Sequence, residues 1–188
     1  GDLDDVEALI EIISILKDVS TNRFFVFAQQ KTEFTKFLEV FLIFFNLLEG
    51  IETECPLVRN DNPGTDILVV TSEASFMSQL NSRVCNAAYA EFQKQKDAKI
   101  ICVGFRGGEK CRQLGMPVEK VYTNVEEPSR YDTALNIRDL LIERIMSGQA
   151  GKAVCIYTWP KSFNVLKPRI IKLLPASELL GGDEAAVG

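Results

Sequence analysis

The side chains of this 188-residue chain that could do chemistry are few, and histidine is not among them. Without histidine the chain has no ordinary general base near neutral pH and cannot form a Ser-His or Cys-His pair. It also lacks the usual ligand of most zinc and haem sites. We therefore expect no catalytic residues, no metal site and no bound cofactor.

Two polar segments nevertheless lie where α/β proteins often bind ligands. Residues 104–110 (Gly-Phe-Arg-Gly-Gly-Glu-Lys) follow an apolar run and precede a short helical pattern, as a phosphate loop would. Their spacing matches neither Gly-x-Gly-x-x-Gly nor Gly-x-x-x-x-Gly-Lys-Ser/Thr, which favours a plain strand-to-helix turn. At the carboxyl end of the first predicted strand lie Thr71, Ser72 and Glu73. Without histidine or Gly-x-Ser-x-Gly, they are best interpreted as a loop with a helix N-cap. A small-ligand site built from the two segments stays open as an alternative.

The cysteines are scattered and include no Cys-x-x-Cys pair; they are Cys55, Cys85, Cys102, Cys111 and Cys155. An odd, scattered set in apolar surroundings is typical of reduced core cysteines in an intracellular protein. The acidic N-terminus also lacks the basic region of a signal peptide. We expect Cys102 and Cys155, which lie within apolar strand patterns, to be core residues rather than redox groups.

The charge of the chain is uneven along its length. The composition is 46% hydrophobic and 25% charged, which is enough to bury a core, and the net charge is −5. The first fifty residues hold nine acidic and four basic side chains, whereas the rest of the chain holds equal numbers of both. General nucleic-acid binding needs a basic face, so it is not expected.

The first block, residues 1–50, predicts a long helix. Between residues 3 and 49 there is no Gly or Pro, and apolar side chains recur in steps of three and four at Phe34, Phe37, Phe41, Phe44 and Leu48. This heptad-like seam indicates one helix face held against a partner helix. A helix of roughly 45 residues would reach about 65–70 Å, past a globule of about 130 residues, so part of it should project. The apolar run 37–48 is shorter than the roughly twenty residues of a membrane span.

The remainder of the chain predicts an α/β domain. Residues 51–65, with Asn-Asp-Asn-Pro-Gly, have the composition of a linker. Between 66 and 175, strands are predicted at 67–71, 99–103, 119–123 and 153–157, with helices at 79–95, 109–114 and 131–147. A last strand at 165–174 is expected on an edge because it contains Pro168. The predicted fold class is α/β, a small mostly parallel sheet with helices on both faces, preceded by the long N-terminal helix and followed by a flexible tail at 176–188.

Several motifs occur in a recognisable order. Residues 66–73 read Asp-Ile-Leu-Val-Val-Thr-Ser-Glu, and residues 80–84 read Leu-Asn-Ser-Arg-Val. Residues 101–107 (Ile-Cys-Val-Gly-Phe-Arg-Gly), the pair Ile156-Tyr157 and the Leu-Leu-Pro at 173–175 follow. The first block contributes Ile15-Leu16-Lys17 and the separate positions Thr21, Ala28 and Lys31. In this order and spacing, from about residue 6 to residue 175, the chain resembles the gamma subunit of F-type ATP synthases.

The resemblance implies a rotor, the central stalk that couples ion-driven rotation to ATP synthesis or hydrolysis in partner catalytic subunits of a proton-transporting ATP synthase. The gamma subunit does no bond chemistry itself. The implied partners are the alpha and beta subunits of the catalytic ring, the epsilon subunit and the membrane c-ring. The complex would be peripheral on the cytoplasmic face of the inner membrane. The residues expected to contact partners are Thr21, Arg23, Ala28, Lys31, Phe34, Phe37, Phe41, Phe44 and Leu48.

The chain also departs from the family pattern. Only thirteen residues follow Pro175, so the second shaft helix of the family has no counterpart here, by truncation or divergence. Residues 74–79 (Ala-Ser-Phe-Met-Ser-Gln) replace Arg-Gly-Leu-Cys-Gly, and the first block is acidic where the family tends to be basic. We expect a divergent or C-terminally shortened gamma chain. The alternatives are an interaction module that reuses the gamma fold and self-associates through the phenylalanine seam, and the small-ligand-binding α/β domain.

Overall fold

The computed structural model describes residues 55–71, 78–124, 130–162 and 165–175. Strands and helices follow one another along these ranges: β1 (Thr65–Val70), α3 (Ser78–Lys94), β2 (Ala98–Val103), α4 (Phe105–Gln113), β3 (Val118–Tyr122), α5 (Arg130–Met146), β4 (Lys152–Ser162) and β5 (Val165–Leu174). The predicted N-terminal helix and the C-terminal tail lie outside the described residues.

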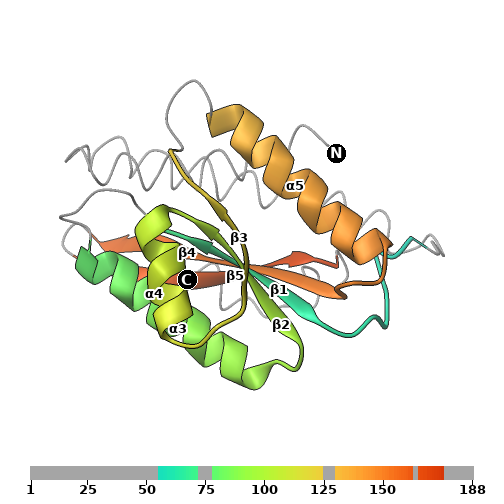
Figure 1. Ribbon diagram of the computed structural model, residues 1–188, viewed down its shortest axis with the longest axis horizontal. Coiled ribbons are helices and arrows are strands. Elements are labelled where there is room, and N and C mark those ends of the chain that lie inside the picture. Colours follow the sequence, from blue (N-terminus) through green and yellow to red (C-terminus); the bar gives the residue numbers. More distant parts are fainter. Residues whose placement is uncertain (1–54, 72–77, 125–129, 163–164, 176–188) are drawn as a thin grey trace.

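The described strands form one five-stranded sheet in the order β3-β2-β1-β4-β5 (Figure 1). The central strand β1 pairs in parallel with β2 and with β4, so that Ile67 lies between Ile100 and Val154. Strand β3 pairs in parallel with β2, and only the β4–β5 pair is antiparallel. The prediction of a mostly parallel sheet, with the Pro168 strand at an edge, is therefore confirmed.

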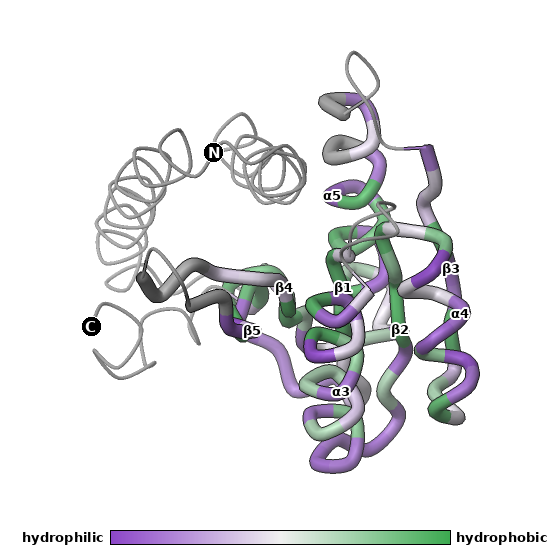
Figure 2. The backbone as a smooth tube through the Cα atoms, turned by 90° about the vertical axis from the view of Figure 1, so that its left-hand side faces the viewer, coloured by the Kyte–Doolittle hydropathy of each residue, from purple (hydrophilic) through white to green (hydrophobic). Residues whose placement is uncertain are grey.

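Helices cover both faces of the sheet, as predicted. Figure 1 shows α5 on one side and α3 with α4 on the other. On the α5 side, Leu68 and Ile101 share a buried apolar cluster with Ile137 and Leu141 of the helix. On the opposite side a second cluster joins strand residues such as Ile67 to the inner faces of α3 and α4. Strand β1 is buried along its whole length, which explains its unbroken apolar run, and Figure 2 shows the apolar colour concentrated on the central strands.

The helix patterns have simple local causes. In α5, Ile137, Leu141 and Ile145 recur every four residues and are almost completely buried, which places them on one face. Gly148 ends this helix with φ 78°, and its N–H donates to the carbonyl oxygen of Ile145 at 3.1 Å. Glycine is suited to this left-handed position because it has no Cβ.

Two predicted boundaries were wrong. The helix predicted at 109–114 begins at Phe105 and ends at Gln113. Gly107 and Gly108 disfavour a helix locally, which is why the prediction began after them. They are nevertheless helical, because both are buried against neighbouring elements. The strand predicted at 153–157 runs on to Ser162, because it continues to pair with β5 in the antiparallel ladder. In both cases a tertiary contact outweighs the local preference.

Candidate functional site

Thr71 lies at the carboxyl edge of the sheet, where the sequence suggested a possible ligand site. Its side-chain hydroxyl donates to the carbonyl oxygen of Val103 at 2.7 Å, and its backbone N–H donates to the same oxygen at 2.9 Å. Thr71 is only 4% exposed. Both donors are therefore used to join the ends of β1 and β2. Ser72 and Glu73 lie outside the described residues.

The glycines at 104–110 bring α4 close to Thr71. A Cβ added to Gly107 would lie 2.1 Å from Thr71 Oγ1, and one added to Gly104 would lie 2.4 Å from it. Gly104 has φ 103°, and its N–H donates to the carbonyl oxygen of Tyr122 at 2.8 Å. A Cβ on Gly108 would lie 2.7 Å from Val121 on β3. These glycines are required for close packing, which supports the interpretation as a strand-to-helix turn and weakens the ligand-site alternative.

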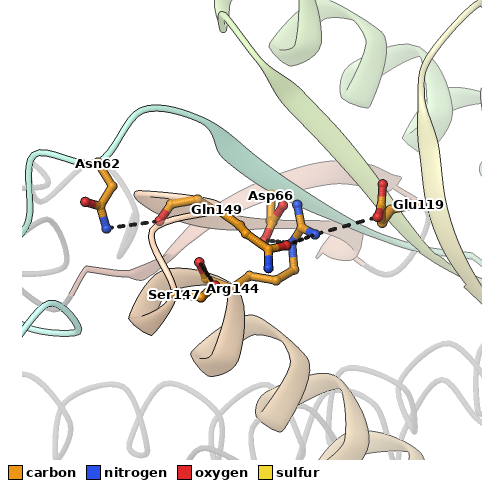
Figure 3. Close-up of polar contacts among 7 residues, drawn as sticks. Asn62, Asp66, Glu119, Arg144, Ser147 and Gln149 are labelled. Carbon is orange, nitrogen blue, oxygen red and sulfur yellow. Dashed lines mark hydrogen bonds and ion pairs between the residues drawn. The ribbon is translucent and has the colours of Figure 1, made fainter.

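A buried ion pair joins β1 to α5. Arg144 Nε donates to Asp66 Oδ2 at 2.7 Å, and the side chains are 9% and 1% exposed. The guanidinium also donates through Nη1 to Gln149 Oε1 at 3.2 Å and lies 3.8 Å from the half-exposed Glu119 carboxylate (Figure 3). The second oxygen, Asp66 Oδ1, is buried without a hydrogen-bond partner among the described residues.

The two groups of this pair affect each other's protonation. Burial raises the pKa of Asp66 above its ordinary value, and the hydrogen bond and charge of Arg144 oppose that rise. The hydrogen bond to Asp66 raises the pKa of Arg144, which keeps the guanidinium charged. Because no reactant could approach a pair this deeply buried, its role is structural.

This ion pair was not predicted from the sequence, although the sequence contains a signal for it. Arg144 follows Ile137 and Leu141 on the inward face of α5, where an apolar residue would ordinarily stand. A charged side chain at such a position needs a buried partner of opposite charge. The partner lies 78 residues away in the chain, so only the folded structure identifies it.

Four of the five cysteines are core residues, whereas Cys55 is only half-buried, so the prediction of a core cysteine is wrong for that position. Cys102 and Cys155 are fully buried, which confirms the prediction, and Cys85 and Cys111 are buried as well. The Cys111 thiol donates to Cys85 Sγ at 3.9 Å. Hydrogen bonding by Cys102 raises the pKa of Cys111 to about 12, and burial raises the pKa of Cys155. Thiols with raised pKa values are poor nucleophiles.

The predicted partner-contacting residues cannot be placed in the same way. Thr21, Arg23, Ala28 and Lys31, together with the phenylalanine seam that ends at Leu48, all lie outside the described residues, so their role stays a prediction. Across the described ranges, no group of three or more cysteine and carboxylate side chains is arranged to hold a metal ion. None of the helices in those ranges has the length and apolar character of a membrane span.

The fold and these side chains define a class of protein: an α/β sheet domain whose ligand edge is closed by Thr71 and the glycines that pack on it. Comparison with known proteins gives the family. A family model described as ATP synthase matches residues 3–186, nearly the whole chain. The chain therefore belongs to the ATP synthase gamma-chain family, and the resemblance inferred from the motifs is confirmed.

Curated relatives named ATP synthase gamma chain include that of Pelotomaculum thermopropionicum, 28% identical over 110 residues, which are 58% of this chain and 39% of the relative. The gamma chain of Alkaliphilus metalliredigens is 27% identical over 121 residues, 64% of this chain and 42% of the relative. That of Chlorobaculum parvum is 28% identical over 127 residues, 64% of this chain and 44% of the relative. The chain thus spans about two fifths of the length of these relatives.

Proposed function

We propose that this chain is a gamma-like central-stalk subunit of an F-type ATP synthase, which couples ion-driven rotation to ATP synthesis or hydrolysis in partner catalytic subunits. The observation that carries the proposal is the family match over residues 3–186, because it includes both the phenylalanine-rich first block and the sheet domain. The curated relatives are named ATP synthase gamma chain, which supports the same function.

The subunit would act mechanically, as a non-catalytic part of a proton-transporting complex. Turning an asymmetric shaft changes which catalytic site of the surrounding ring is closed, so rotation and nucleotide affinity become coupled. The described edge of the sheet supports this role, since Thr71 and the glycines of residues 104–108 are engaged in packing rather than presented to a reactant.

The proposed partners are the alpha and beta subunits of the catalytic ring, the epsilon subunit and the membrane c-ring. The complex would be peripheral on the cytoplasmic face of the inner membrane. The contact surface toward partners would consist of Thr21, Arg23, Ala28, Lys31, Phe34, Phe37, Phe41, Phe44 and Leu48. An apolar seam repeated in steps of three and four is the pattern that a partner helix or a close-fitting ring can cover.

Co-expression of the full chain with the alpha and beta subunits encoded in the same genome tests the proposal. We expect the chain to elute with both subunits in size-exclusion chromatography. The double variant Phe37→Ser/Phe41→Ser should lower the recovered complex by at least about tenfold, which corresponds to about 1.4 kcal/mol of binding free energy.

Met146→Ser is the matched control for this experiment. Met146 is 53% exposed at the end of α5, so the substitution also exchanges an apolar for a polar side chain but lies outside the proposed surface. It should leave recovery unchanged. Failure of the unmodified chain to elute with alpha and beta would overturn the proposed function, and full recovery with the double variant would overturn the assigned surface.

A further inference from the structure

The segment before β1 has the composition of a linker, yet hydrogen bonds hold it to the sheet domain. Asn60 Nδ2 donates to the carbonyl oxygen of Pro56 at 2.7 Å and to that of Gly151 at 3.0 Å. The side-chain oxygen of Asn60 accepts the backbone N–H of Asn62 at 3.0 Å. One side chain therefore folds the segment on itself and ties it to a residue 91 positions away.

Asn62 and Gly64 complete this attachment. Asn62 Nδ2 donates to the carbonyl oxygen of Ile145 at 3.2 Å and to that of Ala150 at 3.5 Å, and Figure 3 shows its side chain directed toward the turn after α5. The carbonyl oxygen of Gly64 accepts the N–H groups of Gly151 at 2.9 Å and Lys152 at 3.2 Å. These bonds satisfy backbone groups of the α5-to-β4 turn that would otherwise need water.

The two segments also touch through their backbones and the core. A Cβ added to Gly151 would lie 2.0 Å from the carbonyl oxygen of Asn62, so only glycine permits this approach. On the other side, Leu57 is packed against the apolar cluster beneath α5. Just beyond Gly64, the buried pair of Asp66 with Arg144 joins β1 to the last turn of the same helix. Hydrogen bonds, backbone contact and apolar packing thus act at one place.

We propose that residues 55–64 and 144–152 form a fixed joint, through which force on the chain that precedes Cys55 passes directly into the sheet. A free linker of the same length would swivel and dissipate torque, because a flexible chain transmits force only when stretched. The joint resists such movement, since displacing the segment breaks the Asn60 and Asn62 bonds together and exposes Leu57. Its mechanical use rests on the proposed function, whereas its rigidity does not.

Hydrogen exchange of the full chain tests the rigidity. We expect the amides of Asn62, Gly151 and Lys152 to exchange much more slowly than in an unprotected peptide, because each donates a hydrogen bond within the joint. Asn60→Ala removes three of the joint's hydrogen bonds and should speed their exchange by about tenfold or more. The matched control is Asp61→Ala, an exposed residue between the two asparagines, which should change these rates less than about twofold.

The amide of Thr71, which donates to Val103 across the sheet, is the internal reference and should not change. If exchange of the Thr71 amide also becomes faster in Asn60→Ala, that variant has loosened the whole domain. The experiment is then repeated with Asn62→Ala, which removes only two side-chain hydrogen bonds. Unprotected exchange at Asn62, Gly151 and Lys152 in the unmodified chain would overturn the joint without any variant. Equal effects of Asn60→Ala and Asp61→Ala would overturn the part assigned to Asn60.

A coupling assay then tests the mechanical use. In a complex assembled with alpha, beta and the remaining subunits, Asn60→Ala should lower ATP synthesis relative to uncoupled ATP hydrolysis at least about twofold, while Asp61→Ala should not. If no complex assembles, the proposed function fails while the exchange data still decide the joint. A complex with normal coupling in Asn60→Ala, despite faster exchange, would overturn the mechanical use and leave the proposed function intact.

Discussion

Replacing Arg144 by methionine removes the only cation within 4 Å of the Asp66 carboxylate among the described residues and keeps most of the side-chain volume. At the observed 2.7 Å and an effective dielectric constant of about 20, the attraction between the two charges is about 6 kcal/mol, much of which is offset by their burial. Breaking such a pair from one side leaves an uncompensated buried charge. We therefore expect Arg144→Met to lower the free energy of unfolding by about 3–5 kcal/mol at pH 7.

The double variant Asp66→Leu/Arg144→Met is the control, because it removes both charges together with Asp66 Oδ1, the oxygen that has no hydrogen-bond partner among the described residues. It should be within about 1 kcal/mol of the unmodified chain, or more stable. Urea denaturation followed by circular dichroism measures all three proteins. A double variant as unstable as Arg144→Met would refute the reasoning, since the loss would then come from packing rather than from an isolated charge.

The pH dependence gives a second criterion with a definite sign. Burial raises the pKa of Asp66, and loss of Arg144 removes the main opposing influence, so the pKa of Asp66 rises further in the single variant. The charge of a carboxyl group whose pKa is raised in the folded state does not lower the free energy of unfolding below its unfolded pKa of about 3.8. As the pH rises through the folded-state pKa, the carboxyl group ionises and the free energy of unfolding falls. The loss of unfolding free energy in Arg144→Met should therefore be largest near pH 7 and become smaller as the pH falls toward 4. An equal deficit at both pH values would contradict this account.

Two further predictions concern close packing and thiol reactivity. Gly107→Ala should lower the free energy of unfolding by about 1–3 kcal/mol, because its Cβ would lie 2.1 Å from Thr71 Oγ1. The control Gln113→Ala, at the exposed end of the same helix, should change the free energy of unfolding by less than about 0.5 kcal/mol. Equal melting temperatures of the two variants would show that α4 does not approach Thr71. In the native chain at pH 8, a thiol reagent should label the half-buried Cys55 and spare the buried thiols, among which the pKa of Cys111 is raised to about 12. Prompt labelling that persists in Cys55→Ser would contradict the buried positions.

The central strands were readable from the sequence because a parallel strand covered on both faces appears as an unbroken apolar run. The run that begins at Ile67 and the run that ends at Val103 therefore predicted β1 and β2 to within two residues. The step of four from Ile137 to Leu141 and Ile145 predicted α5 for the same kind of reason, since a helix must bury one face. The order of the strands in the sheet was not readable, because it depends on which remote strands meet.

By itself, then, the amino-acid sequence determined the described sheet and helix segments apart from the start of α4 and the end of β4, the edge position of the Pro168 strand and the family of the chain. Only the tertiary structure decided that Gly107 makes room for Thr71, that Asp66 neutralises Arg144, and that Asn60 holds an apparent linker to the turn at Gly151. The physical reason is that a local pattern records which face of an element must be buried. The atoms that fill the space beside that face come from segments far away in the chain.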